Sequence, residues 1–394
     1  MAENKNLRQY EKTHPWITFK YNFNALDYLT WVQLGEIKSK CTHIAEAPLL
    51  PEYHEKLMHI FLVKGVLATT AIEGNTLTEE EVDRRIKGNL NLPPSKEYLG
   101  KEIDNIVEAY NEIGNEILNG GKTEISVAMI NKFNEIVLNG LPLAEGVVPG
   151  ELRNYSVGVA NYRGAPPEDC EYLIDRYVTW LNHGFTAPEG QENIFGVLKA
   201  IMAHLYFVWI HPYGDGNGRT ARLIEFQILL SAGIPAAAAH LMSNHYNITR
   251  SEYYRQLDNA SKSGGDILPF IKYAIQGFVD GLIEQIDLIQ GQQIQVHWIN
   301  YIHQVFTDKD SIADRRKRTL ILGLSETNNI VPLDKVRYIT PKIAEIYASL
   351  SDKTISRDID DLLSLDLIVK TKQGIRCKWE SMQSFLTRTR VLNG

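Results

Sequence analysis

The sequence predicts a mainly α-helical protein, and three observations support this fold class. Several long stretches carry apolar residues at every third or fourth position, which is the spacing of helices that bury one face. Residues 149–168 depart from this pattern, because they alternate apolar residues with glycines as a short β-hairpin does. Residues 340–376 then follow the order helix, helix, hairpin.

The composition is typical of a soluble cytoplasmic protein with more than one domain. A chain of 394 residues with 44% hydrophobic residues is long enough for two or three cores. It has no run of eighteen apolar residues and no apolar signal segment at its start, so we expect no membrane association. Three scattered cysteines without a CxxC pair argue against a disulfide framework or a zinc site and fit a reducing cytoplasm.

The net charge of −7 is unevenly distributed along the chain. Residues 335–394 contain eleven Lys or Arg against seven Asp or Glu, and the rest of the chain is acidic. This C-terminal excess of positive charge favours an acidic partner. It is too small to indicate nucleic-acid binding by itself.

We expect the N-terminal third to be helical after an extended beginning. Residues 1–50 are interpreted as an apolar, extended segment that packs on the body of the protein. Pro51 stands at the first position of a helix that ends within residues 69–75. Two further helices, separated by Asn-Gly breaks, are predicted over 101–118 and 125–138.

Residues 211–222 read His-Pro-Tyr-Gly-Asp-Gly-Asn-Gly-Arg-Thr-Ala-Arg and follow a predicted buried helix over 192–210. The helix should end at His211, because Pro212 disfavours the α conformation of the residue before it. Three alternate glycines then suit a backbone that approaches a ligand closely. The next helix is expected to begin near Thr220.

This stretch has the groups to bind a phosphate chain and to activate a hydroxyl. The free N–H groups at the helix start and the guanidinium groups of Arg219 and Arg222 can bind phosphate oxygens. An imidazole with a pKa near neutrality, such as that of His211, suits removal of a proton from an attacking hydroxyl. The Asp215 carboxylate suits Mg²⁺, which prefers one or two carboxylates together with phosphates.

The same stretch resembles the signature of the Fic family, His-Pro-Phe-x-Asp/Glu-Gly-Asn-Gly-Arg followed three residues later by another Arg, with Tyr213 in place of Phe. The resemblance implies a protein adenylyltransferase, which moves AMP from ATP to a hydroxyl of a target protein. It implies that His211 is the general base and that Asp215 holds Mg²⁺. Tyr213 would lie in the core, where its hydroxyl needs a partner. The nucleotide-binding residues that the resemblance implies here are Gly216, Asn217, Gly218, Arg219 and Arg222.

The end of the Pro51 helix resembles the inhibitory motif of a subset of this family, Ser/Thr-x-x-x-Glu-Gly/Asn, with Thr69, Glu73 and Gly74 at its defined positions. A glutamate at a helix C-terminus faces the negative end of the helix dipole and favours a cationic partner. The resemblance implies that Glu73 contacts the nucleotide site, pairs with Arg222 and prevents productive placement of the γ-phosphate. A surface glutamate before a glycine cap is the alternative.

The hairpin within 149–168 resembles the flap of the same family. The resemblance implies that the flap binds a target segment by strand pairing, so that the target hydroxyl points at the base. It also places Val157 and Gly158 at the nucleotide, and Arg153 matches a family position. A hairpin without a ligand is the alternative.

Tyr253 and Tyr254 stand at the start of a predicted helix and resemble the adenine side of the family's nucleotide site, where an aromatic face can stack on a base. An aromatic pair on a helix is equally typical of a core. Two glycines then break this helix, and the last core helix is predicted over 267–288.

The C-terminal pattern resembles a winged helix-turn-helix, joined to the core by a helical bridge over 297–320. The basic residues able to contact DNA in such a domain are Lys353, Arg357, Lys370, Lys372 and Arg376. Three carboxylates on the second helix would repel phosphates, namely Asp358, Asp360 and Asp361. We therefore favour binding to a target or to a second copy over DNA binding.

The sequence thus predicts an N-terminal helical region with the inhibitory helix (1–110), a Fic catalytic core (111–290), and a helical linker with a winged helix-turn-helix domain (291–394). ATP is the expected substrate and Mg²⁺ the expected cofactor. The expected partners are hydroxyl-bearing target proteins, the chain itself as a target, and a second copy in a homodimer. The alternatives are a transcription regulator whose core only senses a nucleotide, removal of AMP from a target, and transfer of another phosphate-linked group.

Overall fold

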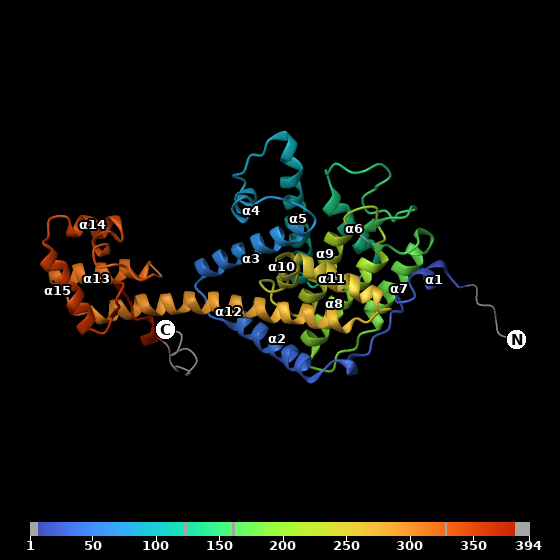
Figure 1. Ribbon diagram of the computed structural model, residues 1–394. Helices are drawn as coiled ribbons and strands as arrows, with labels where there is room; N and C mark the ends of the chain where they lie inside the picture. The colour runs from blue at the N-terminus through green and yellow to red at the C-terminus, as the bar shows by residue number, and fades with distance from the viewer. Residues whose placement is uncertain (1–6, 122–123, 160–161, 328, 383–394) are drawn as a thin grey trace. The chain divides into compact units, whose positions relative to one another are not determined.

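In the computed structural model the chain forms two compact units, Met1–Ile286 and Asp287–Gly394 (Figure 1). The structure describes residues 7–121, 124–159, 162–327 and 329–382. Within these residues both units are built mainly from helices, and each contains a two-stranded antiparallel hairpin. The predicted mainly α-helical class is therefore confirmed.

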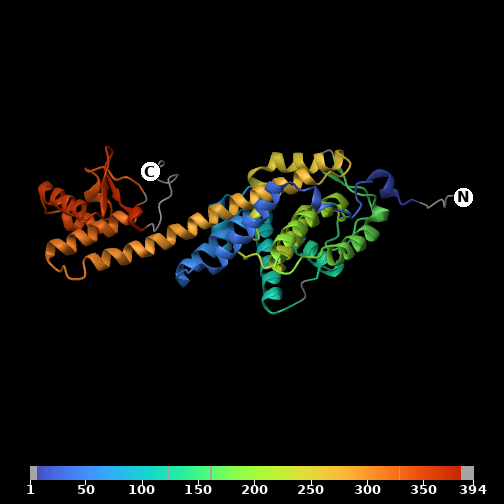
Figure 2. The same cartoon turned by 90° about the horizontal axis from the view of Figure 1, so that it is seen from below.

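The first unit is a bundle of helices with one short hairpin on its surface; Figure 2 shows it turned by 90°. Its helices are α1 (Gln9–Thr13), α2 (Tyr28–Glu46), α3 (Pro51–Ile72), α4 (Glu79–Ile86), α5 (Glu97–Leu118), α6 (Val127–Leu138), α7 (Cys170–His183), α8 (Glu192–Ile210), α9 (Asn217–Ser231), α10 (Leu241–Ile248), α11 (Arg250–Lys262) and the first half of α12 (Leu268–Val305). The hairpin consists of β1 (Gly158–Val159) and β2 (Tyr162–Arg163).

Helix α8 is the core helix of the first unit and packs most extensively on α9. Gly196 permits this contact, because a Cβ at that position would lie 2.1 Å from the Cβ of Ala232. Among the described helices only α8 is long and apolar enough to cross a membrane, and 72% of its apolar window is buried inside the unit. Core packing therefore accounts for its hydropathy.

The prediction of an extended beginning over residues 1–50 is wrong, because α2 occupies nineteen of them. The Asp27 side chain caps this helix by accepting a hydrogen bond from the Thr30 N–H at 2.9 Å. Leu34, Ile37 and Cys41 follow at helical spacing and are buried. The aromatic residues before Asp27 obscured this pattern.

Three predicted boundaries also differ from the structure. Helix α9 begins at Asn217, three residues before Thr220, because Gly216 takes a positive φ and starts the helix early. Helix α12 continues through 288 to Val305, because Gly291 alone does not interrupt a long helix. The predicted boundary at 110/111 falls inside α5, and region 1–110 and residues 111–286 are parts of one unit.

The second unit has its own core. Its elements after α12 are α13 (Ile312–Ser325), α14 (Pro341–Tyr347), α15 (Asp352–Ser364), β3 (Ile368–Lys370) and β4 (Ile375–Cys377). Val331, between α13 and α14, forms a further antiparallel bridge with Ile375 of β4. Trp298 and Ile302 from the end of α12 are buried in this core together with residues of α13, α14 and α15.

Candidate active site

His211 ends α8 in a left-handed backbone conformation, with φ 51° and ψ 60°. This conformation is uncommon for a residue other than glycine, and Pro212 disfavours the helical alternative. The Nδ1 atom lies 3.3 Å from the carbonyl oxygen of Val208. Because a carbonyl only accepts, Nδ1 carries the proton and Nε2 is left as the basic nitrogen.

The loop after His211 is closed by hydrogen bonds to buried side chains. Asn217 accepts from the Tyr213 N–H and donates to the Tyr213 carbonyl, both at 2.9 Å. Its side chain therefore closes the loop, and its backbone N–H and the second Nδ2–H remain for the predicted contact with phosphate. The Tyr213 hydroxyl is buried and donates to Asn131 Oδ1 at 2.5 Å, which supplies the partner expected from the sequence.

Arg222 lies on the first turns of α9 and is bonded to the end of α3. Its Nη2 lies 2.6 Å from Glu73 Oε1 and 2.9 Å from the Thr69 carbonyl, and its Nε donates to Thr69 Oγ1 at 2.7 Å. The predicted partners thus meet across 149 residues of sequence. The ion pair has a single contact, because Nε donates to Thr69 and Nη1 makes no hydrogen bond within the described residues.

The Glu73 carboxylate lies over the N-terminus of α9. A Cβ on Gly218 would lie 2.1 Å from Glu73 Oε1, so only glycine permits this approach. A helix N-terminus attracts anions through its free N–H groups and its dipole. Glu73 therefore occupies a place that suits a phosphate oxygen equally well.

Arg219, one turn earlier on α9, pairs with a carboxylate that the sequence did not indicate. Its Nη1 lies 3.0 Å from Oε1 of Glu102, which lies on α5. Asn75, two residues after Glu73, donates from its Nδ2 to Glu102 Oε2 at 2.8 Å. No local motif marks Glu102, because it is 117 residues from its partner.

Arg153 connects the flap to the catalytic loop. It is buried and donates to the carbonyl oxygens of His211, Tyr155 and Ala165 at 2.8, 2.7 and 2.5 Å. A Cβ on Gly164 would lie 2.8 Å from the Cβ of His211, so this glycine lets the flap approach the histidine closely. Arg153, at the family position noted above, thus fixes the hairpin beside the base.

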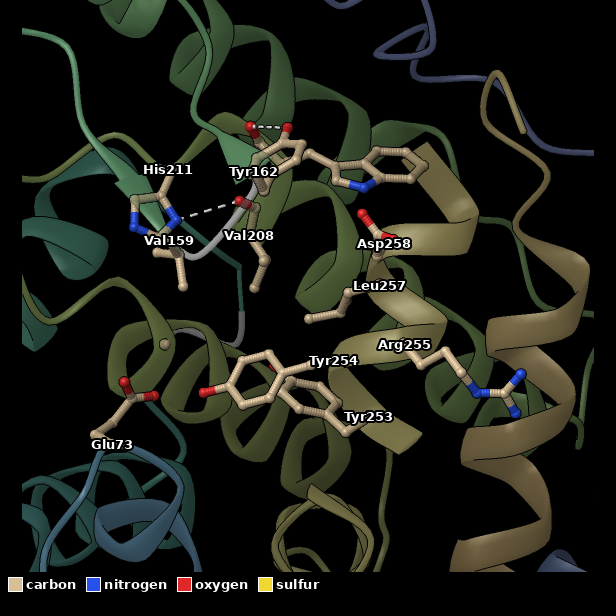
Figure 3. A pocket seen from close by; sticks show the side chains of 12 residues that line it. Glu73, Val159, Tyr162, Val208, His211, Tyr253, Tyr254, Arg255, Leu257 and Asp258 are labelled. Carbon is tan, nitrogen blue, oxygen red and sulfur yellow. Dashed lines mark hydrogen bonds between the residues drawn. The ribbon is translucent and has the colours of Figure 1, made fainter. Parts of the chain in front are cut away.

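A cavity of about 380 Å³ opens between these elements (Figure 3). Tyr253 and Tyr254 of α11 line it together with Leu257 and Asp258. Tyr253 is buried in the core, whereas Tyr254 is 36% exposed and its hydroxyl donates to the carbonyl of Ile72 at 3.4 Å. Of the two, Tyr254 is thus the more accessible. The other lining residues are Glu73, Val159, Tyr162, Val208, Trp209, His211, Gly218 and Arg255.

The structure brings most of the predicted site residues to one place. Glu73, His211, Gly218 and the two tyrosines line the cavity, and Arg219 and Arg222 lie on the α9 turns behind Gly218. The flap residues in the lining are Val159 and Tyr162 instead of the predicted Val157 and Gly158. Val157 and Gly158 directly precede Val159, and their contact with a nucleotide stays a prediction.

Asp215 is more open than the other candidates, with 53% of its side chain exposed. Its Oδ1 accepts from the Gly216 N–H at 2.5 Å and lies 3.7 Å from Arg219 Nη2. The carboxylate is therefore fixed at the mouth of the loop, with oxygen lone pairs still free.

Burial and charge set the protonation states of the two ionisable groups that face each other across the cavity. Burial lowers the pKa of His211 to about 4, and the nearby charge of Arg153 acts in the same direction. At Glu73 burial opposes ionisation, but the charge and hydrogen bond of Arg222 outweigh it and lower the pKa. At pH 7 the imidazole is neutral and the glutamate is an anion.

Comparisons with known proteins identify relatives of this helical core. Residues 124–229 match the model of the Fic/DOC family. Protein adenylyltransferase fic-1 of Caenorhabditis elegans is 27% identical over 250 residues, which cover 64% of this chain and 45% of that relative. Protein adenylyltransferase Fic of Drosophila grimshawi is 31% identical over 253 residues, which cover 63% of this chain and 47% of that relative. The chain spans about half the length of the curated relatives it matches.

Solved structures share the fold. A Fic family protein from Desulfovibrio desulfuricans G20 superposes with a TM-score of 0.52 at 21% identity, covering 91% of this chain and 96% of that one. Residues 134–508 of Fic-1 from C. elegans give a TM-score of 0.54 at 25% identity, covering 66% of this chain and 73% of that one. The predicted Fic-type helical core is confirmed by these likenesses.

Proposed function

We propose, from the premise that residues 124–229 form a Fic domain, that the whole chain is a protein adenylyltransferase transferring AMP from ATP to a Ser, Thr or Tyr hydroxyl of a target protein. The observation that carries this proposal is one cavity with a neutral imidazole on one side and the anion-attracting start of α9 on the other. A base and a phosphate site that line the same cavity suit attack of a hydroxyl on a bound nucleotide.

The chemical step follows from the tautomer of His211. Nε2 accepts the proton of the target hydroxyl while that oxygen forms a bond to the α-phosphorus of ATP. The bond between the α-phosphorus and the bridging oxygen breaks, and diphosphate leaves with the electron pair. The proton remains on Nε2, and the Val208 carbonyl keeps Nδ1–H in place.

The start of α9 supplies the electrostatic part of the site. The glycine amides and the helix N-terminus face the phosphates, and two guanidinium groups lie behind them. Arg222 Nη1 and Arg219 Nε are buried and make no hydrogen bond within the residues that the structure describes. Because buried unpaired donors are costly, a phosphate chain that reaches them gains binding energy.

Asp215 is the proposed magnesium ligand. No cluster of three or more His, Cys, Asp or Glu side chains suited to a metal occurs in the described parts of the chain. A single fixed carboxylate fits Mg²⁺, which takes its remaining ligands from phosphates and water. When bound, the ion neutralises phosphate charge, and Asp215 orients it from the loop.

Autoinhibition by Glu73 is part of the proposal. Its carboxylate lies against Gly218 and uses one donor of Arg222, so a γ-phosphate cannot occupy the same place. ATP would then bind with its α-phosphorus turned away from the attacking hydroxyl. Movement of the end of α3 would restore the productive arrangement.

Transfer is tested by incubating the full chain with ATP labelled at the α-phosphate and a cell lysate, followed by mass spectrometry of labelled proteins. We expect label on hydroxyl side chains, with release of diphosphate. ATP labelled only at the γ-phosphate is the control and should leave proteins unlabelled. Absence of label from the α-labelled nucleotide, with both wild type and Glu73→Gly, would contradict the proposal.

The same experiment separates the alternatives. A target labelled beforehand and then incubated with the chain reveals removal of AMP, which uses the same base and phosphate groups. Transfer from another nucleotide would appear when ATP is replaced. Binding of ATP without any transfer would favour a nucleotide sensor instead.

We also propose that the chain modifies itself, forms a homodimer and is cytoplasmic. Tyr28, Leu29 and Val32 expose apolar side chains on one end of α2, which supports pairing of two copies. Cys41, Cys170 and Cys377 are unpaired, which supports a reducing compartment. Self-labelling tests the first statement, light scattering tests the dimer, and cell fractionation tests the location.

A further inference from the structure

The second unit contains a helix-turn-helix element followed by a hairpin. Helices α14 and α15 are joined by four residues, 348–351, a turn length typical of DNA-binding helix pairs. Val331 adds a third strand position, because its N–H and carbonyl both bond to Ile375 of β4 at 2.8 and 2.9 Å. The order α13, Val331, α14, α15, β3, β4 is therefore that of a winged helix-turn-helix, with α13 as the first helix.

Helix α15 has one buried face and one free face. Ile355, Ile359 and Leu362 are buried in the core of the unit. On the opposite face Lys353, Ser356 and Arg357 are exposed. The free face of the N-terminal half thus presents a hydroxyl and two cations, which are groups that bond to base edges and phosphates.

Three of the four carboxylates on α15 are paired with side chains of the same unit, and Asp352, the first of them, lies 2.8 Å from Arg337 Nη2. Asp358 is 3% exposed, accepts two hydrogen bonds from Arg316 at 2.6 and 2.8 Å, and accepts a third from the Tyr347 hydroxyl. Asp361 lies 3.0 Å from Lys317 Nζ of α13. These ion pairs offset the negative charges that would otherwise repel DNA phosphates. Asp360 is the one carboxylate of α15 without an ion pair in the described part of the chain.

Four cations remain available around α15 and the hairpin. Lys353 and Arg357 of α15 and Lys370 and Lys372 of the hairpin are exposed, and none pairs with a carboxylate within the described residues. Arg376, expected in the basic wing, pairs instead with Glu380 at 2.5 Å. Lys353, Arg357, Lys370 and Lys372, here together called the basic face, are thus exposed cations that no carboxylate of the described residues neutralises.

We propose that the basic face binds duplex DNA, with α15 in the major groove and the β3–β4 hairpin on the adjacent phosphates. The major groove of B-form DNA admits an α-helix, whereas that of an RNA duplex is too narrow. This activity goes beyond AMP transfer and does not depend on the cavity of the first unit.

The test measures fluorescence anisotropy of a labelled 25-base-pair duplex titrated with the full chain. At 50 mM salt we expect a dissociation constant on the order of micromolar, typical of electrostatic binding. Affinity should fall with salt with a log–log slope of about −0.9 for each phosphate contacted, so four cations predict a slope near −3.6. A double-stranded RNA of the same sequence should bind at least about tenfold more weakly.

Charge-reversal variants locate the surface. Lys353→Glu/Arg357→Glu should weaken binding at least about tenfold and reduce the salt slope by about 2, since two phosphate contacts are lost. Lys12→Glu/Lys132→Glu, the same charge change on exposed residues of the first unit, is the matched control and should change affinity less than about threefold. His211→Ala should bind DNA as the wild type does, which separates this proposal from AMP transfer.

Several results would overturn the proposal. One is the absence of DNA binding at 50 mM salt. Another is an equal loss of DNA affinity in the two double variants when their melting temperatures are equal. The third is equal affinity for double-stranded RNA and DNA. Self-association that disappears in Lys353→Glu/Arg357→Glu while DNA does not bind would assign the basic face to a protein interface.

Discussion

Arg219 and Arg222 lie one turn apart on α9, and each is bonded to a carboxylate from a different helix. Glu73, the partner of Arg222, is the C-cap residue of α3 and precedes Gly74, which has φ +104° and open space around it. Glu102, the partner of Arg219, lies within the 22-residue helix α5. Rotation of a few backbone dihedral angles at the end of α3 would move Glu73, whereas the backbone of Glu102 moves only with α5. The comparison agrees with the proposed regulatory role of Glu73 and suggests a supporting role for Glu102.

The largest effect is expected from removing His211, the proposed base. His211→Ala should lower AMP transfer by roughly 10²–10⁴-fold, because the attacking hydroxyl keeps its proton. The measurement is incorporation of label from ATP labelled at the α-phosphate, in the wild-type and Glu73→Gly backgrounds. ATP binding should persist, because the start of α9 is unchanged. Near wild-type transfer would exclude His211 as the base.

Removal of the regulatory carboxylate should increase transfer. Glu73→Gly ends a charge-assisted hydrogen bond of ~1.5–3 kcal/mol to Arg222, which corresponds to roughly 10–100-fold in rate. The gain should appear as self-labelling and should vanish in Glu73→Gly/His211→Ala. Glu73→Gln, with the same shape and no charge, should give an intermediate rate. Equal labelling by wild type and Glu73→Gly would mean that Glu73 does not restrain AMP transfer.

Glu102 should behave differently from Glu73. Glu102→Gln retains an oxygen for Asn75 but removes the charge opposite Arg219, so we expect a loss of ~1–3 kcal/mol in the free energy of unfolding. Labelling per folded molecule should stay within about threefold of wild type. Thermal unfolding and labelling at equal folded concentration measure the two quantities. A gain in labelling as large as that of Glu73→Gly would give both carboxylates the same role.

Thr69 should have a smaller effect in the same direction as Glu73. Thr69→Val keeps the shape and removes the hydroxyl that accepts from Arg222 Nε, so the guanidinium is less firmly fixed; we expect about 3–10-fold more labelling. Thr70→Val is the control, because the Thr70 hydroxyl bonds only to α3 carbonyls. Similar rates for the two variants would assign the effect to packing of α3.

The smallest change is expected on altering pH in Glu73→Gly. The pKa of His211 is about 4, and removal of an anion does not raise it, so the imidazole stays neutral from pH 8 to 5.5. Labelling should change less than about twofold over this range and decline only as pH falls towards 4. A decline centred near pH 6.5 would mean that the histidine is not buried during turnover.

The sequence predicted those parts of the site that short motifs encode. His211, Glu73 and Arg222 each belong to a stretch with defined spacing, and the structure brings them together. Glu102 was missed because its partner is distant in sequence and nothing near it distinguishes it from a surface residue. The side chain of Asn217 also closes the loop, a role that only the folded backbone reveals, and its phosphate contact stays a prediction.

The fold shows the same limit. Helices with a clear apolar period were predicted with their ends within a few residues, as α6 and α8 show. Helix α2 was missed because Asp27 and the apolar residues after Thr30 were interpreted together with the aromatic segment before them. The second unit was predicted as two helices and a hairpin, and its bridge at Val331 depends on a contact 44 residues away that no local pattern records.

If Glu73 inhibits as proposed, Gly218 limits which point mutations can make this protein constitutively active. Any side chain at that position would displace the Glu73 carboxylate, since a Cβ alone would lie 2.1 Å from Oε1. The same side chain would stand where a phosphate approaches α9, so release from inhibition would be accompanied by loss of the nucleotide site. Gain-of-function alleles are therefore expected at the end of α3 and not at the start of α9, although both surfaces meet at a single contact.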